Sequence, residues 1–293
     1  MNRLLLTMLL IIAAGTVFSQ PRIGIKGSVE WETMRINAAV SLDMASAGLR
    51  IPAGRMQGES VLSAGFLNLI RSSILGLQVD SSTTVGDLVH KGEFSLPETE
   101  AIALKANSLP PAFSPDMRHL TTSYTILISN ISSAFFRHSR PSPITRTLRP
   151  VSSAHYTGIV IIAIESLPVY SMRGTTLAVP CIFPKIWDSD MNLIYERSML
   201  EIGNYNMVRY ASSRDIFQNS PSGISEDLRQ TVGDRPLRIF ARGVFGIVPT
   251  DLIIDRSDAL LIISTEENRR LLSEGRVAII LDESVLRYEF SGE

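Results

Sequence analysis

Residues 35–44 read RINAAVSLDM, and this stretch decides the fold of the first half of the chain. Apolar and polar side chains alternate along it, with Ile36, Val40 and Leu42 pointing to one side. A period of two predicts a β-strand that buries one face and leaves the other open. Residues 22–31, just before it, alternate more loosely and predict a shorter strand beside it.

Two helices are predicted after this strand. Residues 58–77 carry apolar side chains at helical spacing, which predicts a helix that packs its apolar stripe on the strand. Pro97 opens a second helix, since proline suits the first helical position and two glutamates follow it in the first turn. Residues 123–136 then alternate again. Strands with helices segregated to one face predict an α+β layer.

The second half begins after a stretch of a different composition. Residues 137–153 read RHSRPSPITRTLRPVSS, without periodicity, and predict an extended connection because residues before proline avoid the helical region. Residues 156–164, YTGIVIIAI, then predict a strand buried on both faces. We therefore expect an α+β protein with mostly antiparallel sheets, helices packed on one face, and two halves. Its predicted parts are a signal peptide at 1–19, an N-terminal α+β domain at 20–136, a Pro/Arg-rich connection at 137–153 and a C-terminal α+β domain at 154–293.

The first nineteen residues have the composition of a secretory signal. A short basic start precedes the apolar run LLLTMLLIIAAG, and small residues follow it, which predicts cleavage after Ser19. The alternative is an uncleaved anchor, but a membrane span needs about 20 apolar residues. We expect a periplasmic protein with no membrane span after cleavage. Cys181 is the single cysteine, so an internal disulfide is excluded. A net charge of −1 does not point to nucleic acid.

Residues 181–196, CIFPKIWDSDMNLIYE, suggest two different structures. Oxygen-bearing side chains at every second position from Asp188 to Asn192 resemble the start of a calcium loop. That loop also needs a glycine and a bidentate glutamate, where this chain has Leu193 and Met199. The sequence therefore favours a β-hairpin whose turn uses Asp and Asn. The candidate interaction residues are Trp187, Asp188, Asp190, Asn192 and Tyr195.

Residues 117–164 contain no Asp or Glu but several arginines. One interpretation is an anion-binding surface for polymer phosphates or acidic envelope glycans. The other, which the spread of the arginines favours, is a solvated strand face with a basic linker. No zinc spacing, phosphate loop or nucleophile elbow occurs in the sequence. We expect no catalytic residue, no metal and no cofactor.

Three runs of residues resemble a known group of proteins. Residues 156–163, 184–195 and 276–282 resemble the distal half of exported bacterial proteins related to flagellar assembly protein T and to a family of small outer-membrane lipoproteins. The whole chain also resembles uncharacterised periplasmic proteins of spirochaete type. It departs from the pattern where Ile162 replaces an aspartate and where a hairpin glycine is replaced near Met191. The lipidated cysteine of the lipoprotein members is absent.

The resemblance implies a non-catalytic periplasmic accessory protein of the cell envelope. It would be flagellum-associated and would act through protein–protein interaction with envelope or flagellar proteins. An alternative of another class is a hydrolase of envelope polymers that uses carboxylates such as Asp188, Asp190 and Glu196. A third is a binding protein for envelope polymers or a small ligand. The partner and the oligomeric state stay open.

Overall fold

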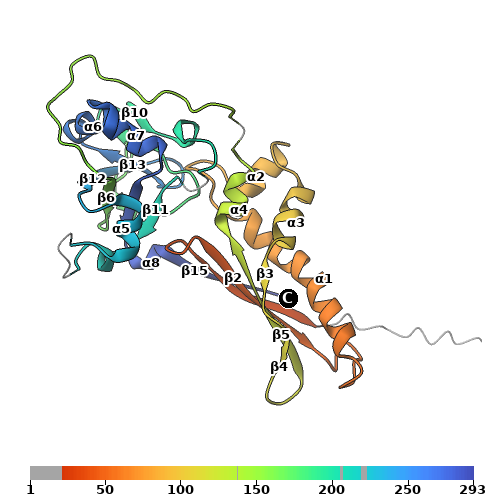
Figure 1. The fold of residues 1–293 in the computed structure, drawn as a ribbon. Helices are drawn as coiled ribbons and strands as arrows, with labels where there is room; N and C mark the ends of the chain where they lie inside the picture. The colour runs from red at the N-terminus through yellow and green to blue at the C-terminus, as the bar shows by residue number, and fades with distance from the viewer. Residues whose placement is uncertain (1–21, 137, 205–206, 219–222) are drawn as a thin grey trace, which may run out of the picture.

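The structure is a computed structural model that describes residues 22–136, 138–204, 207–218 and 223–293. The predicted signal peptide, residues 1–19, lies outside the described residues. The described chain forms two layered halves that lie side by side, each with its own sheet and helices (Figure 1). The predicted α+β class in two halves is confirmed.

The first sheet is antiparallel, and its strand order is β15-β1-β2-β5-β3. Three long strands, β1 (Ile23–Glu30), β2 (Arg35–Asp43) and β5 (His119–Leu127), form its centre. The short strands β3 (Asn107–Ser108) and β4 (Ala112–Phe113) both pair with β5. The alternation predicted for residues 35–44 is confirmed, because the even-numbered side chains of β2 are buried and the odd-numbered ones lie on the other face.

Helices cover one face of this sheet (Figure 1). They are α1 (Arg55–Leu75), α2 (Val85–His90) and α3 (Leu96–Leu104). Phe66 of α1 stacks on Tyr124 of β5 with ring centroids 3.7 Å apart. α3 begins with a capping box between Ser95 and Glu98, which satisfies the free N–H groups of its first turn. The strand predicted over 123–136 ends at Leu127, and α4 (Ile128–Ser133) follows.

One strand of the first sheet comes from the far end of the sequence. β15 (Arg287–Gly292) pairs antiparallel with β1, so that Gly27 faces Phe290. A Cβ added to Gly27 would lie 2.5 Å from the Phe290 ring, so glycine is needed for this approach. The predicted division placed residues 154–293 together in the second half. The pairing of β15 with β1 departs from that division.

The second sheet is mixed, whereas mostly antiparallel sheets were expected. Its strand order is β10-β9-β13-β12-β6-β14-β11. The central strands run parallel to one another: β12 (Leu237–Phe245), β6 (Ile159–Ala163), β14 (Val277–Leu281) and β11 (Arg209–Ala211). β13 (Asp251–Ile254) is antiparallel to β12 and parallel to β9 (Ile186–Asp188), which pairs antiparallel with β10 (Leu193–Tyr195).

The centre of this second sheet is buried on both faces, as the apolar run in residues 156–164 predicted. Val160 and Ile280 pack with α5 (Glu226–Val232) on one side. Ile161 and Ile279 join the main core on the other side, with α6 (Arg256–Ile263) and α7 (Glu266–Ser273). Helices thus lie on both faces of this sheet. The remaining short elements are β7 (Leu167–Pro168), β8 (Thr175–Thr176), η1 (Arg197–Met199), η2 (Ser213–Asp215) and α8 (Glu283–Leu286).

The two halves share one hydrophobic core, and a loop of the first half is built into the second. The carbonyl oxygens of Gln78 and Val79 accept from the N–H groups of Ile182 and Phe183, at 3.0 and 2.8 Å. The loop itself is held by Asp80. Burial would raise the pKa of Asp80, but hydrogen bonds from the Ser82 N–H and nearby hydroxyls lower it below its ordinary value. Trp31 also packs edge-on against Tyr210, with centroids 5.8 Å apart.

Residues 138–153, called the strap below, run from α4 to the second half without helix or strand (Figure 1). They cross the surface of the second half. No helix among the described residues is both long and apolar enough to cross a membrane.

Candidate functional site

The turn between β9 and β10 is built around the side chain of Asp188. Its Oδ1 accepts from the N–H groups of Asp190 and Asn192, at 3.0 and 2.8 Å. The Asn192 amide donates to both of its carboxylate oxygens. The Asp188 side chain is only 5% exposed. Asp188 therefore serves the hairpin itself, and the predicted β-hairpin is confirmed.

Met191 adopts the left-handed backbone conformation in this turn, with φ of +61°. The sequence resemblance placed a replaced hairpin glycine near this residue. Glycine adopts positive φ without steric cost, whereas methionine does not. The hydrogen bonds of Asp188 to the N–H groups on either side of Met191 hold the backbone in this conformation.

Arg256, at the start of α6, connects the turn to its surroundings. Its Nη1 lies 3.2 Å from Asp188 Oδ2 and 2.7 Å from Asp190 Oδ2. A hollow of about 360 Å³ lies beside these groups, between the hairpin, α6 and the strap. We call it the strap hollow. Its polar lining comes from Asp188, Asn192, Arg256, Thr145, Arg146, Thr147 and Arg149, and its apolar lining from Leu148, Ile194, Ala259, Leu260 and Ile263.

The two aromatic residues of the predicted set lie elsewhere. Tyr195 is fully buried, and its hydroxyl donates to the Met207 carbonyl at 2.9 Å. Burial raises the pKa of Tyr195 well above its ordinary value. Trp187 is half-buried, and its indole N–H donates to Asp251 Oδ2 at 3.3 Å. The structure therefore brings Asp188, Asp190 and Asn192 together and separates them from the two aromatic rings.

Asp251 is a buried carboxylate at the junction of the halves. It accepts from the Ser81 hydroxyl of the first half at 3.1 Å and from the Lys185 N–H at 3.2 Å. Burial raises its pKa despite these bonds. Burial also raises the pKa of the nearby Cys181 thiol. Both groups contribute to packing at the junction, and Cys181 is buried as a small apolar side chain would be.

The carboxylates considered for hydrolysis do not share one site. Asp188 and Asp190 meet at Arg256, as described above. Glu196 follows β10 and accepts from the Ser198 hydroxyl at 2.6 Å, and it does not line the strap hollow. Among the described residues no group of three or more His, Cys, Asp or Glu side chains is arranged to hold a metal.

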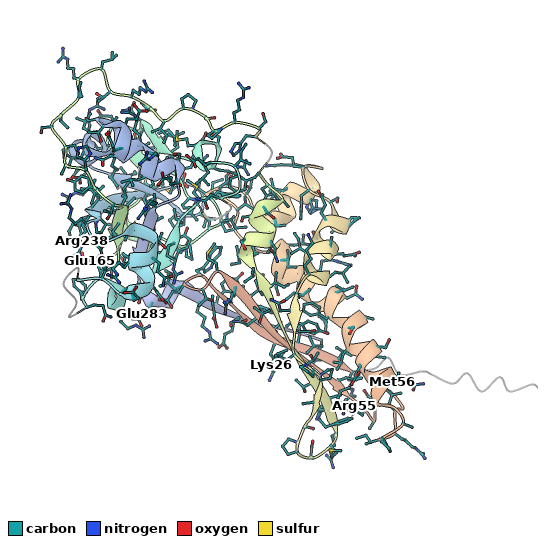
Figure 2. The ribbon with its side chains drawn as sticks, in the orientation of Figure 1. Lys26, Arg55, Met56, Glu165, Arg238 and Glu283 are labelled. Carbon is teal, nitrogen blue, oxygen red and sulfur yellow. The ribbon has the colours of Figure 1, made fainter. Side chains whose placement is uncertain are left out.

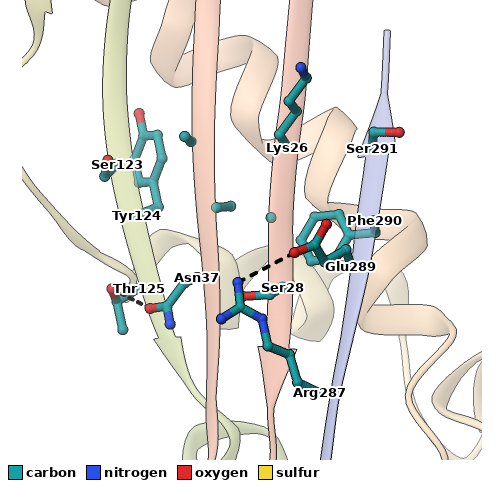
Figure 3. A pocket seen from close by; sticks show the side chains of 13 residues that line it. Lys26, Ser28, Asn37, Ser123, Tyr124, Thr125, Arg287, Glu289, Phe290 and Ser291 are labelled. Atoms are coloured by element: carbon teal, nitrogen blue, oxygen red, sulfur yellow. Dashed lines mark hydrogen bonds and ion pairs between the residues drawn. The ribbon is translucent and has the colours of Figure 1, made fainter. Parts of the chain in front are cut away.

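A second candidate surface was not foreseen from the sequence. It is the face of the first sheet opposite α1, which we call the open face. Lys26 projects from this side, whereas Arg55 and Met56 lie on the α1 side (Figure 2). The open face carries a hollow of about 650 Å³ (Figure 3). Its lining includes Lys26, Ser28, Asn37, Ala39, Ser123, Thr125, Arg287, Glu289 and Ser291.

Small side chains occupy the middle of the open face, and charged ones stand at its β15 edge. Ser28, Asn37 and Thr125 are neighbours across three strands. Thr125 Oγ1 donates to Asn37 Oδ1 at 3.0 Å. Arg287 and Glu289 flank this row from β15, with Arg287 Nη2 3.5 Å from Glu289 Oε1 (Figure 3). The polar positions of residues 35–43 could have indicated this face, but nothing local in the sequence places β15 there.

Both halves match family models from one spirochaete protein. Residues 22–134 match the N-terminal domain of Treponema pallidum Tp0624, and residues 158–283 match its second domain. Neither matched range includes the strap or β15. They fit the expected resemblance to spirochaete-type proteins and do not show a link to flagellar assembly protein T. A comparison with curated proteins found no match.

Proposed function

We propose that this chain is a non-catalytic accessory protein of the bacterial cell envelope that binds another envelope protein on the open face. The similarity of both halves to Treponema pallidum domains supports a protein of spirochaete type. The composition of residues 1–19 supports export to the periplasm. An association with flagella rests on the sequence resemblance alone.

The open face carries the proposal because its side chains are unusual for a solvated sheet. A sheet face that only meets water commonly carries long charged side chains, which keep it soluble. Here the centre holds Ser28, Asn37 and Ala39, and the face is hollowed. Short side chains allow the backbone of a partner to approach closely. Lys26, Arg287 and Glu289 at the rim present both signs of charge, so we expect a partner segment that carries both an acidic and a basic side chain.

A substitution in the centre of the open face tests this proposal. Ala39→Arg places a long charged side chain in the hollow, and we expect loss of a protein partner that co-purifies with the wild-type chain from gently solubilised native cells. Met56→Arg is the matched control, because Met56 is 81% exposed on α1, on the other side of the sheet (Figure 2). Circular dichroism checks that both variants are folded.

A substitution in the hairpin tests which of the two candidate surfaces binds the partner. Ser189→Arg changes an exposed residue at the hairpin tip. If Ser189→Arg abolishes co-purification and Ala39→Arg does not, the contact lies at the hairpin and the open-face proposal is wrong. If the wild-type chain elutes alone, the accessory-protein proposal loses its support. Identification of the partner by mass spectrometry decides whether it belongs to the flagellum.

Export and signal cleavage are tested separately from partner binding. We expect N-terminal sequencing of the protein from cells to begin at Gln20, and cell fractionation to place it in the periplasm. A chain that retains Met1 and sediments with membranes would instead indicate an uncleaved anchor.

A further inference from the structure

The strap is fixed at its two ends and unattached over the strap hollow. Ser142 N–H donates to the Ser198 carbonyl at 2.7 Å. Val151 N–H donates to Ser264 Oγ at 3.0 Å, and Ser153 Oγ donates to the Leu261 carbonyl at 2.8 Å. Between these anchors, residues 145–149 make no hydrogen bond to the rest of the described chain. Residues 145–149 span the hollow between the two anchors, and Leu148 is fully exposed to solvent.

Three arginines line this one hollow. Arg146 and Arg149 come from the strap, and Arg256 comes from α6. Among the described residues neither strap arginine has a carboxylate within ion-pair distance. The two ion pairs of Arg256 both use Nη1, so its Nε and Nη2 are available. The hollow therefore offers guanidinium donors from two elements.

The acidic side chains nearby offset this charge only in part, since Asp188 and Asp190 are two carboxylates against three arginines. Asp188 lines the hollow, but its oxygens are occupied by the turn and by Arg256. Asp190 is 58% exposed and competes for Arg256 only. The strap lies in a stretch, residues 117–164, that has no acidic residue at all. Arg149 thus has no acidic side chain beside it on the strap, whereas Arg146 also borders a second hollow lined by Glu201, Glu266 and Glu267.

The donor set and the size of the hollow fit a phosphate group better than a carboxylate. An arginine fork binds two oxygens of an anion, and arginines from two elements suit the three terminal oxygens of a phosphate monoester. A volume of about 360 Å³ lies within the range of small-molecule sites. Ile194, Leu260 and Ile263 add an apolar wall, which suits the carbon part of a sugar or glycerol unit.

We propose that the strap hollow binds a phosphate monoester carried by an envelope sugar or a lipid headgroup. Arg146 and Arg149 bind the phosphate from the strap, and Arg256 binds it from α6. Thr145 supplies a hydroxyl donor beside the arginines, whereas the Thr147 hydroxyl donates to the Arg149 carbonyl and helps to shape the strap. This site lies on the second half, so it is independent of protein binding at the open face of the first sheet.

Titration calorimetry of the full chain with glucose 1-phosphate tests the site, and phosphatidylcholine vesicles with and without phosphatidic acid test the lipid source. We expect saturable binding that weakens with added salt, and a loss of about tenfold in affinity for Arg149→Ala. Arg140→Ala is the matched control, because Arg140 lies on the same strap outside the hollow, and its affinity should stay within about twofold. Asp190→Asn should bind more tightly, since it removes one of the two negative charges beside Arg256 while the pair with Asp188 remains.

Several results would overturn the proposal. They are the absence of saturable binding to both the sugar phosphate and the vesicles, an equal loss for Arg140→Ala and Arg149→Ala, or unchanged affinity in the Arg146→Ala/Arg149→Ala double variant. Binding to phosphatidic acid vesicles alone would keep the site and assign the phosphate to a lipid. Ala39→Arg should bind the phosphate probe as well as wild type does, so the two proposals fail separately.

Discussion

Trp187 makes an aromatic contact with Phe245 and a hydrogen bond to the buried Asp251. Its ring packs edge-on against Phe245 with centroids 5.9 Å apart, while its N–H reaches the buried Asp251. Ser81 donates to the same carboxylate oxygen from the first half. Because burial raises the pKa of Asp251, its contribution to stability is fully present below the unfolded pKa and is lost as the pH rises through the folded pKa. Trp187 helps to hold this carboxylate where its charge is costly.

Replacement of Trp187 by Phe isolates the hydrogen bond from the packing. Trp187→Phe keeps an aromatic ring against Phe245 but removes the N–H donor to Asp251, so we expect a loss of about 1 kcal/mol in the free energy of unfolding. Tyr170→Phe is the control, because Tyr170 packs on the same Phe245 ring and its hydroxyl makes no hydrogen bond within the described residues. Its change should stay within about 0.5 kcal/mol. Urea unfolding measures both, and equal losses would contradict the role of the N–H.

The hairpin is the element that the sequence predicted best. Alternating Asp and Asn side chains between two short apolar runs predicted the turn, and in the structure Asp188 Oδ1 accepts from the backbone N–H groups of Asp190 and Asn192. The burial of Tyr195 and the contact between Trp187 and Asp251 were beyond such reasoning. Both depend on residues far away in the chain, Met207 and Asp251. Local pattern predicts the turn, and tertiary contacts decide which of its residues face a hollow.

Met191, which has a left-handed backbone conformation, gives a prediction for the stability of the hairpin. Met191→Gly should raise the free energy of unfolding by about 0.5 kcal/mol, because relief of the left-handed strain exceeds the added freedom of the unfolded chain. Met172→Gly is the control: it is exposed and does not have a positive φ, so glycine there should give no gain. Thermal unfolding compares the two variants. A loss in Met191→Gly equal to that in Met172→Gly would show that Met191 is not strained.

Over the whole molecule, the halves that the sequence separates are joined at three places. β15 completes the first sheet, the loop around Ser81 enters the second half, and Trp31 packs on Tyr210. None of these could be predicted, since each pairs segments distant in sequence through the final geometry. The division at the strap was visible because prolines and arginines interrupt the periodic segments on both sides. The α+β class followed from the periodic segments alone.

These three contacts between the halves predict that the protein unfolds as one cooperative unit. Gly27→Ala tests this at the strand pairing, because a Cβ there would lie 2.5 Å from the Phe290 ring and closer still to the Asn37 carbonyl. We expect a loss of about 2 kcal/mol or more, as overpacking displaces β15. Gly24→Ala is the matched control on the same strand, since the nearest atom to its added Cβ is 3.7 Å away.

The two tryptophans report on the halves separately. Trp31 follows β1 in the first half and Trp187 lies in β9 of the second. In single-tryptophan backgrounds made with Trp31→Phe and Trp187→Phe, Gly27→Ala should lower both fluorescence midpoints in urea by the same amount, because the shared core couples the halves. If only the Trp31 transition moves, the halves unfold independently. β15 would then be an attachment of the second half to the first sheet, with little effect on the stability of the second half itself.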